Sequence, residues 1–358
     1  MRPLLFDVYA GKTALEQIHA SKALRPQDIT AVFGASGAAK WLSISALDGV
    51  IFGDWLRTTD HPIHLFGTSV GAWKLAAAAQ LNPKQALADF ADAYCEQRYG
   101  ASVSHADIQA QTDLIINKVF TPERIDEILN HPRFRFHCGA VRCRGWMQSE
   151  AKPVLAAGMA LCYYGNLLGR QQLRQCYHRV VFHDVRQQPP LEITDGIPTS
   201  SVPLARENFI AAISASGSIP YVMAGVGEVP GTSPGMYRDG GLLDYHPLPA
   251  NLWKSEGMIL YPHFYPHIIP SWFDKSLPWR RATAEQLANV VLLCPSAEFV
   301  RRLPDRKIPS RKDFVRFKGD NETRIQRWQQ CLALSRQMAG EFLDCVNSSK
   351  LPRYVHPL

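Results

Sequence analysis

Residues 62–81, PIHLFGTSVGAWKLAAAAQL, carry the pattern that decides the fold. PIHLF has the composition of a short buried strand, and AWKLAAAAQL is rich in strong helix formers. Between them lies GTSVG, in which two glycines flank Ser69 as G-x-S-x-G. A strand that turns sharply into a helix through such a pentapeptide raises the serine hydroxyl above the edge of a sheet. The stretch therefore predicts an α/β layer with a candidate nucleophile at the sheet edge.

The sequence on either side of this stretch alternates strand-like and helix-like segments, as in a layered α/β domain with a largely parallel sheet. Strands are predicted at 28–33, 62–66, 134–141, 179–184, 236–239, 258–261 and 290–293. Helices are predicted around Trp41, Ile44 and Leu47, after Ser69, after Pro83, and over 102–130, 204–214 and 322–345. No linker is evident, so we expect one domain over 1–358, with a core at about 28–250. Residues 251–358 would pack on this core or cap it.

A second G-x-S-x-G window is centred on Ser233, in GTSPG at 231–235. It follows loop-like residues and precedes a strand, whereas a nucleophile elbow needs a strand before the serine and a helix after it. Pro234 also lacks the N–H that the residue after the nucleophile commonly donates to an oxyanion hole, and Val70 has one. Ser69 is therefore the candidate, with an ordinary glycine turn as the alternative interpretation.

A serine nucleophile needs a base for its proton and donors for the charge that appears on the carbonyl oxygen. Asp239, followed by two glycines at the end of a strand-like segment, is one candidate base, although such DG turns are common. The histidines that could instead complete a Ser-His-Asp triad stand in no recognisable signature; they are His183, His246, His263, His267 and His356.

The loop GASGAAK, at 34–40, follows the first strand and opens a helix. Free backbone N–H groups at such a helix start suit an oxyanion. The loop lacks the G-K-[ST] ending of a phosphate-binding loop and the third glycine of a dinucleotide fingerprint. These features favour an oxyanion hole over a nucleotide site.

Together these motifs resemble those of the patatin-like phospholipases. The likeness consists of a glycine-containing loop with a basic residue, a G-T-S-x-G elbow, an A-S-x-x-I-P stretch and a D-G-G turn, in that order over 33–247. Its motif residues are Gly37, Lys40, Gly67, Ser69, Gly71, the stretch ASGSIPYVM at 215–223, Asp239, Gly240 and Gly241.

The resemblance implies a three-layer α/β/α fold with a mostly parallel central sheet, and a Ser-Asp dyad without a catalytic histidine. Ser69 would attack an acyl ester and Asp239 would act as general base, with a pKa raised by a shielded site. N–H groups around Gly37 and Ala38 would form the oxyanion hole, and Lys40 would add positive charge. The implied activity is hydrolysis of lipid acyl esters through an acyl-serine intermediate, with no cofactor.

The chain departs from the family's usual loop, G-G-G-x-[RK]-G, and reads Ser36-Gly37-Ala38-Ala39-Lys40-Trp41 instead. Ala38 and Trp41 stand where that pattern has glycines. Alanine resists the positive φ values that glycine adopts freely, so the departure bears on the geometry of the hole. The alternatives that stay open are an acyltransferase using the same serine, a lipid-binding protein with little or no catalysis, and a conventional Ser-His-Asp esterase.

Composition bounds the remaining expectations. The hydrophobic fraction of 46% and charged fraction of 20% are ordinary for a globular protein. The eight scattered cysteines indicate reduced thiols in a cytoplasmic protein. His137, Cys138 and Cys143 lack a second pair at zinc spacing, so no metal site is expected. The apolar run near residue 1 is short and soon interrupted, so a signal peptide is not expected. We therefore expect a cytoplasmic enzyme that acts on a lipid or other acyl ester and binds no nucleic acid.

Three segments bear on contact with a membrane. Residues 154–169 are nearly uncharged but too short to span a bilayer, which favours a buried core helix or hairpin over an interfacial helix. Residues 301–318 are strongly basic, as expected of a solvated face or, alternatively, of a membrane-surface patch. Residues 261–279 are rich in proline and aromatics, which excludes a regular helix and leaves either a groove lining or a packed loop. Peripheral contact with a membrane is a further expectation.

Overall fold

The stretch at 62–81 folds as strand β3 (Ile63–Thr68) followed by helix α3 (Val70–Ala78), with Ser69 alone between them. The computed structural model describes residues 3–254 and 257–358. Every residue of β3 and α3 is buried. This explains why neither element shows the alternation or the amphipathic stripe of a surface element, because both lie in the middle of the layers.

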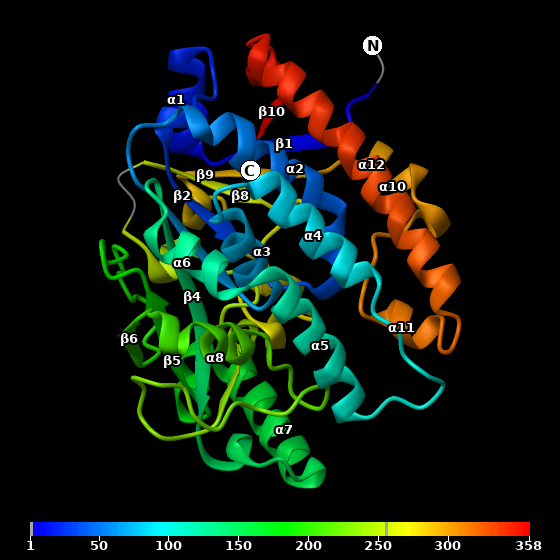
Figure 1. Cartoon of the computed structure of the whole chain (residues 1–358). Helices are drawn as coiled ribbons and strands as arrows, with labels where there is room; N and C mark the ends of the chain where they lie inside the picture. The colour runs from blue at the N-terminus through cyan, green and yellow to red at the C-terminus, as the bar shows by residue number, and fades with distance from the viewer. Residues whose placement is uncertain (1–2, 255–256) are drawn as a thin grey trace.

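In the described part of the chain, ten strands form a mostly parallel sheet at the centre of the α/β fold, as predicted (Figure 1). The order across it is β10-β1-β9-β8-β2-β3-β4-β5-β6, with β7 paired to β4. Neighbours β9, β8, β2, β3 and β4 run parallel, whereas β1–β9, β4–β5 and β4–β7 are antiparallel pairs. The other strands are β1 (Phe6–Ala10), β2 (Ile29–Gly34), β4 (Phe134–Cys143), β5 (Tyr177–His183), β6 (Thr199–Pro203), β7 (Tyr237–Asp239), β8 (Met258–Pro262), β9 (Val290–Pro295) and β10 (Val355–Pro357).

Both faces of the sheet are covered, which gives three layers. Val32 of β2 points into one hydrophobic cluster, whereas its neighbours Ala31 and Phe33 point into another. Helices α2, α3, α4 and α12 pack together around the first cluster (Figure 1). The α-helices are α1 (Lys12–Ser21), α2 (Ser45–Val50), α3, α4 (Pro83–Cys95), α5 (His105–Val119), α6 (Pro122–Asn130), α7 (Lys152–Leu168), α8 (Arg206–Gly217), α9 (Pro249–Leu252), α10 (Ala297–Arg302), α11 (Lys312–Arg316) and α12 (Asn321–Asn347).

All seven predicted strands are present, and the helices predicted at 204–214 and 322–345 are α8 and α12. Residues 102–130 form two helices, α5 and α6, because Thr121 caps a new helix that begins at Pro122. The segment at 251–358 supplies β8 and β9 to the sheet itself, and β8 lies beside β2.

The helix predicted around Trp41 begins as a 3₁₀-helix over Ala38–Ile44 and becomes α-helical only in α2. Ser43 and Ser45 donate their hydroxyls to the carbonyls of Lys40 and Leu42, three residues back. These local hydrogen bonds fit the tighter turn of a 3₁₀-helix.

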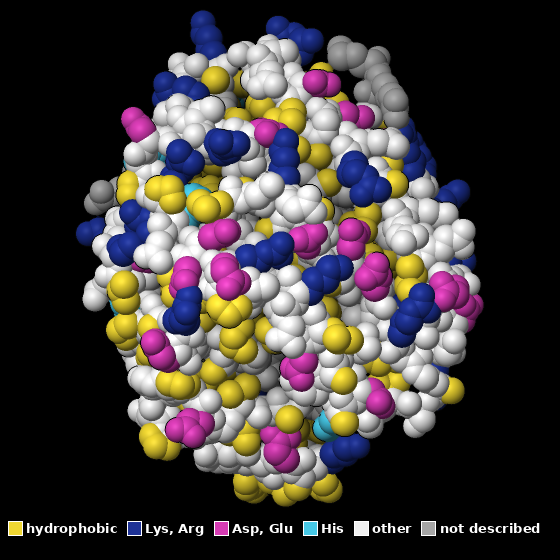
Figure 2. Space-filling model, viewed as in Figure 1, with side chains coloured by type: hydrophobic (Ala, Val, Ile, Leu, Met, Phe, Trp, Pro, Cys, Tyr) yellow, Lys and Arg dark blue, Asp and Glu magenta, His cyan; other side chains and the backbone are white. Residues whose placement is uncertain are grey.

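The uncharged segment at 154–169 forms α7, but the prediction of a buried core helix is wrong. Only Leu155, Gly158, Cys162 and Asn166 of α7 are buried, and Leu168 is 86% exposed. Figure 2 shows hydrophobic side chains gathered at the lower end of the molecule, where Figure 1 places α7. Residues 154–169 carry no charged side chain on any face, so their sequence does not distinguish the buried stripe of the helix from its exposed face. Within the described part of the chain, every helix is too short or too polar to cross a bilayer.

Candidate active site

Ser69 stands at a strained elbow between β3 and α3. Its φ of 54° and ψ of −135° are unusual for a residue with a side chain and are of the kind that clusters at functional sites. The glycines around it permit close packing: a Cβ on Gly71 would lie 2.3 Å from the carbonyl oxygen of Gly34 in β2. A Cβ on Gly67 would lie 2.6 Å from the backbone of Gly71. The G-x-S-x-G spacing is thus what allows α3 to cross so close to the strands.

Strand β4 brings Ser69 and Asp239 together, although 170 residues separate them. Thr68, the last residue of β3, pairs with Gly139, and Asp239, the last residue of β7, pairs with the next residue, Ala140. Because β5 occupies the other edge of β4 over the same residues, β3 and β7 must share one edge and meet end to end. The serine and the aspartate therefore face each other at this junction.

The hydroxyl of Ser69 donates a hydrogen bond to Oδ2 of Asp239 at 2.8 Å. Oδ1 of the same carboxylate accepts from the N–H of Gly241 at 2.7 Å, so both oxygens are held. Each of the two side chains is only 6% exposed. A Cβ on Gly240 would lie 2.2 Å from the carbonyl oxygen of Gly139, which explains why glycine follows the aspartate.

The ASGSIP stretch supports both residues, a role that its sequence did not reveal. Ser216 Oγ accepts from the N–H of Ser69 at 2.9 Å and donates to the carbonyl of Gly139 at 2.7 Å. The carbonyl of Ser218 accepts from the N–H of Asp239 at 3.0 Å. The end of α8 thereby fixes the backbone of both members of the pair. The contacts of its hydroxyl, which only the tertiary structure reveals, explain the serine at position 216.

Burial raises the pKa of Asp239 to about 6, and the hydrogen bonds from Ser69 and Gly241 oppose that shift. Lys275 and Arg311 lower it further through their positive charges, though by less. The direction is the one predicted for a shielded base. A carboxylate with this pKa is ionised at neutral pH, and its acid form gives up a proton within the physiological range.

Three backbone N–H groups beside Ser69 have no partner among the described residues. In the described part of the chain, those of Gly37, Ala38 and Val70 make no recorded hydrogen bond. Gly37 and Ala38 line the same cavity as Ser69. Ala38 adopts φ 49°, the left-handed conformation in which glycine is usual. The substitution thus keeps the loop geometry at the expense of backbone strain of about 1 kcal/mol.

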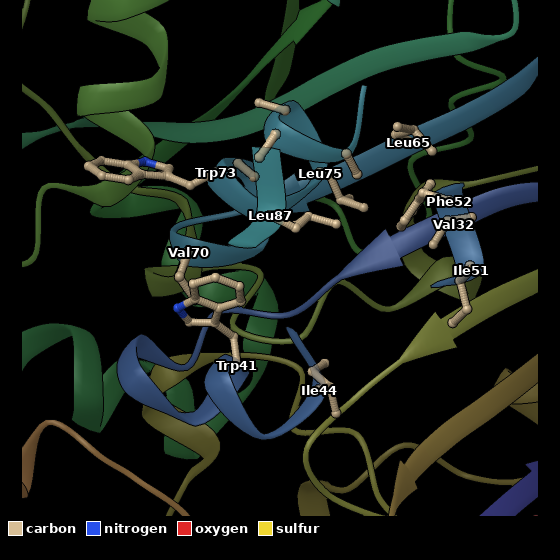
Figure 3. Packing of buried hydrophobic residues seen from close by; sticks show 14 of the residues in the cluster. Val32, Trp41, Ile44, Ile51, Phe52, Leu65, Val70, Trp73, Leu75 and Leu87 are labelled. Carbon is tan, nitrogen blue, oxygen red and sulfur yellow. The ribbon is translucent and has the colours of Figure 1, made fainter. Parts of the chain in front are cut away.

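Trp41, a further departure from the expected loop, lies away from the site. It is 1% exposed and stacks on Phe90 with ring centres 4.4 Å apart. Figure 3 shows its side chain among buried residues near Val70 and Ile44. Its bulk therefore serves the core and does not fill the space beside Ser69.

Lys40 lies at the wall of the cavity. Its Nζ is 3.5 Å from the carbonyl of Gly37 and 3.5 Å from the hydroxyl of Tyr245, and it stands over the Phe264 ring. Burial lowers the pKa of Lys40 to about 8, with help from the charges of Arg311 and Lys312. The lysine thus contacts the loop at 34–40 through Gly37, and within the described residues no hydrogen bond joins it to Ser69.

The other sequence candidates lie apart from this pair. Ser233 is exposed in the loop before β7. The Ser69 hydroxyl has Asp239 as its recorded partner, and no imidazole of the described residues hydrogen-bonds to it. His267 lines the cavity, whereas His183, His246 and His263 are buried in other contacts. This geometry favours an aspartate over a histidine as the base.

Two cavities meet at Ser69. One, of about 780 Å³, is lined by aromatic and basic side chains, including Phe264, Tyr265 and Trp272 from the proline-rich segment. That segment therefore lines a groove. The second, of about 680 Å³, is mostly apolar and lies between α5, α11 and the residues after α8. Ala38, Ser69, Ile219, Arg311 and Lys312 are common to both.

No protein-family model and no curated protein sequence matches the chain. The likeness to patatin-like phospholipases therefore rests on the four motifs and on the arrangement of their residues.

Proposed function

We propose that the protein is a serine hydrolase of lipid acyl esters, with Ser69 as nucleophile and Asp239 as general base. The observation that carries the proposal is the buried 2.8 Å hydrogen bond between the two, at the junction of two cavities. A nucleophile bonded to its base, beside free N–H donors, is the arrangement that acyl transfer requires.

In the first half of the reaction, Ser69 Oγ attacks the ester carbonyl carbon while Asp239 Oδ2 takes the hydroxyl proton. The N–H groups of Gly37, Ala38 and Val70 stabilise the negative charge on the carbonyl oxygen. The protonated aspartate then gives its proton to the departing alcohol oxygen as the C–O bond breaks. This leaves an acyl-Ser69 ester.

In the second half, water attacks the acyl-Ser69 carbonyl and Asp239 takes one of its protons. The tetrahedral intermediate collapses, the carboxylic acid leaves, and the proton returns to Ser69 Oγ. The apolar cavity, with Val70, Trp73, Ile115 and Met223 in its lining, suits the acyl chain. The size and apolar lining of this cavity are the reason for proposing lipid esters as substrates.

The test is labelling of the purified protein by a fluorophosphonate, compared with Ser69→Ala, Ser233→Ala, Asp239→Asn and His267→Gln. We expect Ser69→Ala to abolish labelling and Asp239→Asn to slow it by about 10²–10⁴-fold. Ser233→Ala and His267→Gln should label like the wild type. The wild-type rate should fall below about pH 6, because protonated Asp239 no longer accepts the serine proton.

Two results would overturn the proposal. Loss of labelling in His267→Gln with full labelling in Asp239→Asn would make a histidine the base. No labelling of folded wild-type protein would indicate a lipid-binding protein without this chemistry. If acyl transfer is found, product analysis with an added alcohol separates a hydrolase from an acyltransferase.

A further inference from the structure

Ser36, like Ala38 and Trp41, stands where the family's usual loop has a glycine. It lines the larger cavity beside Gly37 and Ala38, and its side chain is buried. A buried hydroxyl needs hydrogen-bond partners, because leaving it without one costs free energy. The partners of Ser36 lie in the elbow and in the turn after Asp239, so this residue joins the separate segments of the candidate site.

The Ser36 side chain is hydrogen-bonded to Thr68, the residue before the nucleophile. Its Oγ lies 2.9 Å from Thr68 Oγ1 and 3.2 Å from the Thr68 carbonyl oxygen. Thr68 Oγ1 donates its own proton to the carbonyl oxygen of Asp244 at 2.6 Å. Because a hydroxyl carries a single proton, Thr68 Oγ1 must accept from Ser36. The hydrogen-bonded chain therefore has one direction, from Ser36 through Thr68 to Asp244.

The Asp244 end of this chain is held by a buried ionic network. The Asp244 carboxylate accepts from Arg179 Nε at 2.7 Å and from Arg170 Nη2 at 2.9 Å. Arg179 is itself buried and also pairs with Asp195. A buried polar network whose members are paired is rigid. The Asp244 carbonyl is therefore a fixed acceptor for the two hydroxyls.

Ser36 also packs against the turn that holds the base. Its N–H donates to the carbonyl of Tyr245 at 2.8 Å. A Cβ on Gly241 would lie 2.5 Å from Ser36 Oγ, so the serine side chain occupies the space that this glycine leaves open. Gly241 is the residue whose N–H binds Asp239 Oδ1. The Ser36 side chain thus lies between the elbow and the turn and fixes the position of the loop relative to both.

The two residues after Ser36 need such an attachment. Gly37 and Ala38 carry N–H groups that the proposed mechanism assigns to the oxyanion hole, and Ala38 adopts φ 49°. This conformation is unfavourable for alanine because of its Cβ, whereas glycine adopts it freely. Relaxation of Ala38 would change the direction of these N–H groups. A hydrogen-bonded side chain immediately before them opposes that relaxation.

Resting on the proposed hydrolase function, we propose that Ser36 is a positioning residue that holds the oxyanion donors of Gly37 and Ala38 in place relative to Ser69 Oγ. It acts through the hydrogen-bonded chain to Thr68 and contacts neither the nucleophile's hydroxyl nor its base among the recorded hydrogen bonds. Full negative charge develops on the carbonyl oxygen only as the reaction proceeds, whereas the cavity walls bind the intact ester. Loss of the attachment should therefore lower kcat and leave KM nearly unchanged.

The test measures kcat and KM for p-nitrophenyl hexanoate with the full-length protein, Ser36→Ala and Ser36→Gly. We expect both variants to lose about 10–100-fold in kcat with KM within about twofold, since the donors are displaced and not removed. Ser36→Gly restores the family's residue but keeps Ala38, so it should not regain the lost rate. Ser45→Ala is the matched control, because the buried Ser45 hydroxyl donates only to the nearby Leu42 carbonyl, and it should keep the wild-type kcat. Circular dichroism establishes that each variant is folded.

Substitutions of Thr68 test the same chain from its middle, and they do so even if a Ser36 variant fails to fold. Thr68→Val keeps the shape and removes the hydroxyl, so kcat should fall as far as in Ser36→Ala. Thr68→Ser keeps the hydroxyl and should retain most of the rate. Because both hydroxyls serve one chain, Ser36→Ala combined with Thr68→Val should lose little more than Thr68→Val alone. Losses that multiply would show that the two residues act independently and would overturn the proposal.

The pH dependence of kcat/KM separates positioning of the loop from a change in the base. The acid-side midpoint should be the same in Ser36→Ala as in the wild type, because the recorded partners of the Asp239 carboxylate are Ser69 and Gly241. A displaced midpoint, a raised KM with unchanged kcat, or full activity of Ser36→Ala would each overturn the positioning role and leave the hydrolase standing. If the wild type neither cleaves the ester nor reacts with the fluorophosphonate, the underlying hydrolase proposal fails instead.

Discussion

Replacing Asp239 by asparagine should stabilise the folded protein, and the gain should depend on pH. In the folded state, burial raises the pKa of Asp239 to about 6. In the unfolded chain an aspartate has a pKa of about 3.9. Because the folded state holds the proton more tightly, ionisation of this carboxyl costs folding free energy as the pH rises from about 4 to about 6. Asparagine keeps the shape and is never ionised.

The difference of about 2 pKa units corresponds to about 3 kcal/mol at pH 7 and above. At pH 5, where the folded carboxyl is mostly protonated, the same two values give about 1.5 kcal/mol. Changes in the hydrogen bonds from Ser69 and Gly241 add an offset of about 1 kcal/mol in either direction, but that offset does not vary with pH. The diagnostic quantity is therefore the growth of about 1.3 kcal/mol between pH 5 and pH 7.

Urea unfolding of wild type and Asp239→Asn at pH 5, 6, 7 and 8 measures this growth. Asp60→Asn, which removes a carboxylate with a 99% exposed side chain, controls for the loss of one negative charge. A stability difference that is constant with pH would refute the raised pKa. A difference that shrinks as pH rises would show that neighbouring cations lower the pKa of Asp239 by more than burial raises it. Asp239 would then be a weak base, like an ordinary exposed aspartate.

Two further changes probe the backbone of the site. Ala38→Gly should raise the free energy of unfolding by up to about 1 kcal/mol and keep fluorophosphonate labelling, because φ 49° suits glycine; a loss of stability in urea unfolding would contradict the strain. Gly71→Ala should cost about 3 kcal/mol and slow labelling, since its Cβ would lie 2.3 Å from the Gly34 carbonyl oxygen. Gly340→Ala in α12, where a Cβ meets nothing within 4 Å, should instead stabilise slightly.

Local sequence was enough to determine the elements that carry the site. The elbow at Ser69 follows from a buried strand, a glycine turn and a run of helix formers, all within twenty residues. The strands before the GASGAAK loop and before Asp239 were predicted in the same way, because composition and turn residues act over short distances. Strands β1, β6 and β10 were missed, and β10 has only three residues, too few to show a pattern.

Tertiary structure alone decided which of these elements meet. No local signal says that β3 and β7 share one edge of β4, yet this registry places Asp239 against Ser69. The support of the pair by Ser216, the inward packing of Trp41 and the exposure of α7 are likewise products of packing between distant segments. The same holds for the larger cavity at Ser69. Its basic lining residues lie far apart in the sequence, from Lys40 to Lys312, and they share one space only when the chain has folded. Sequence determines the local geometry, and long-range contacts determine which side chains share a space.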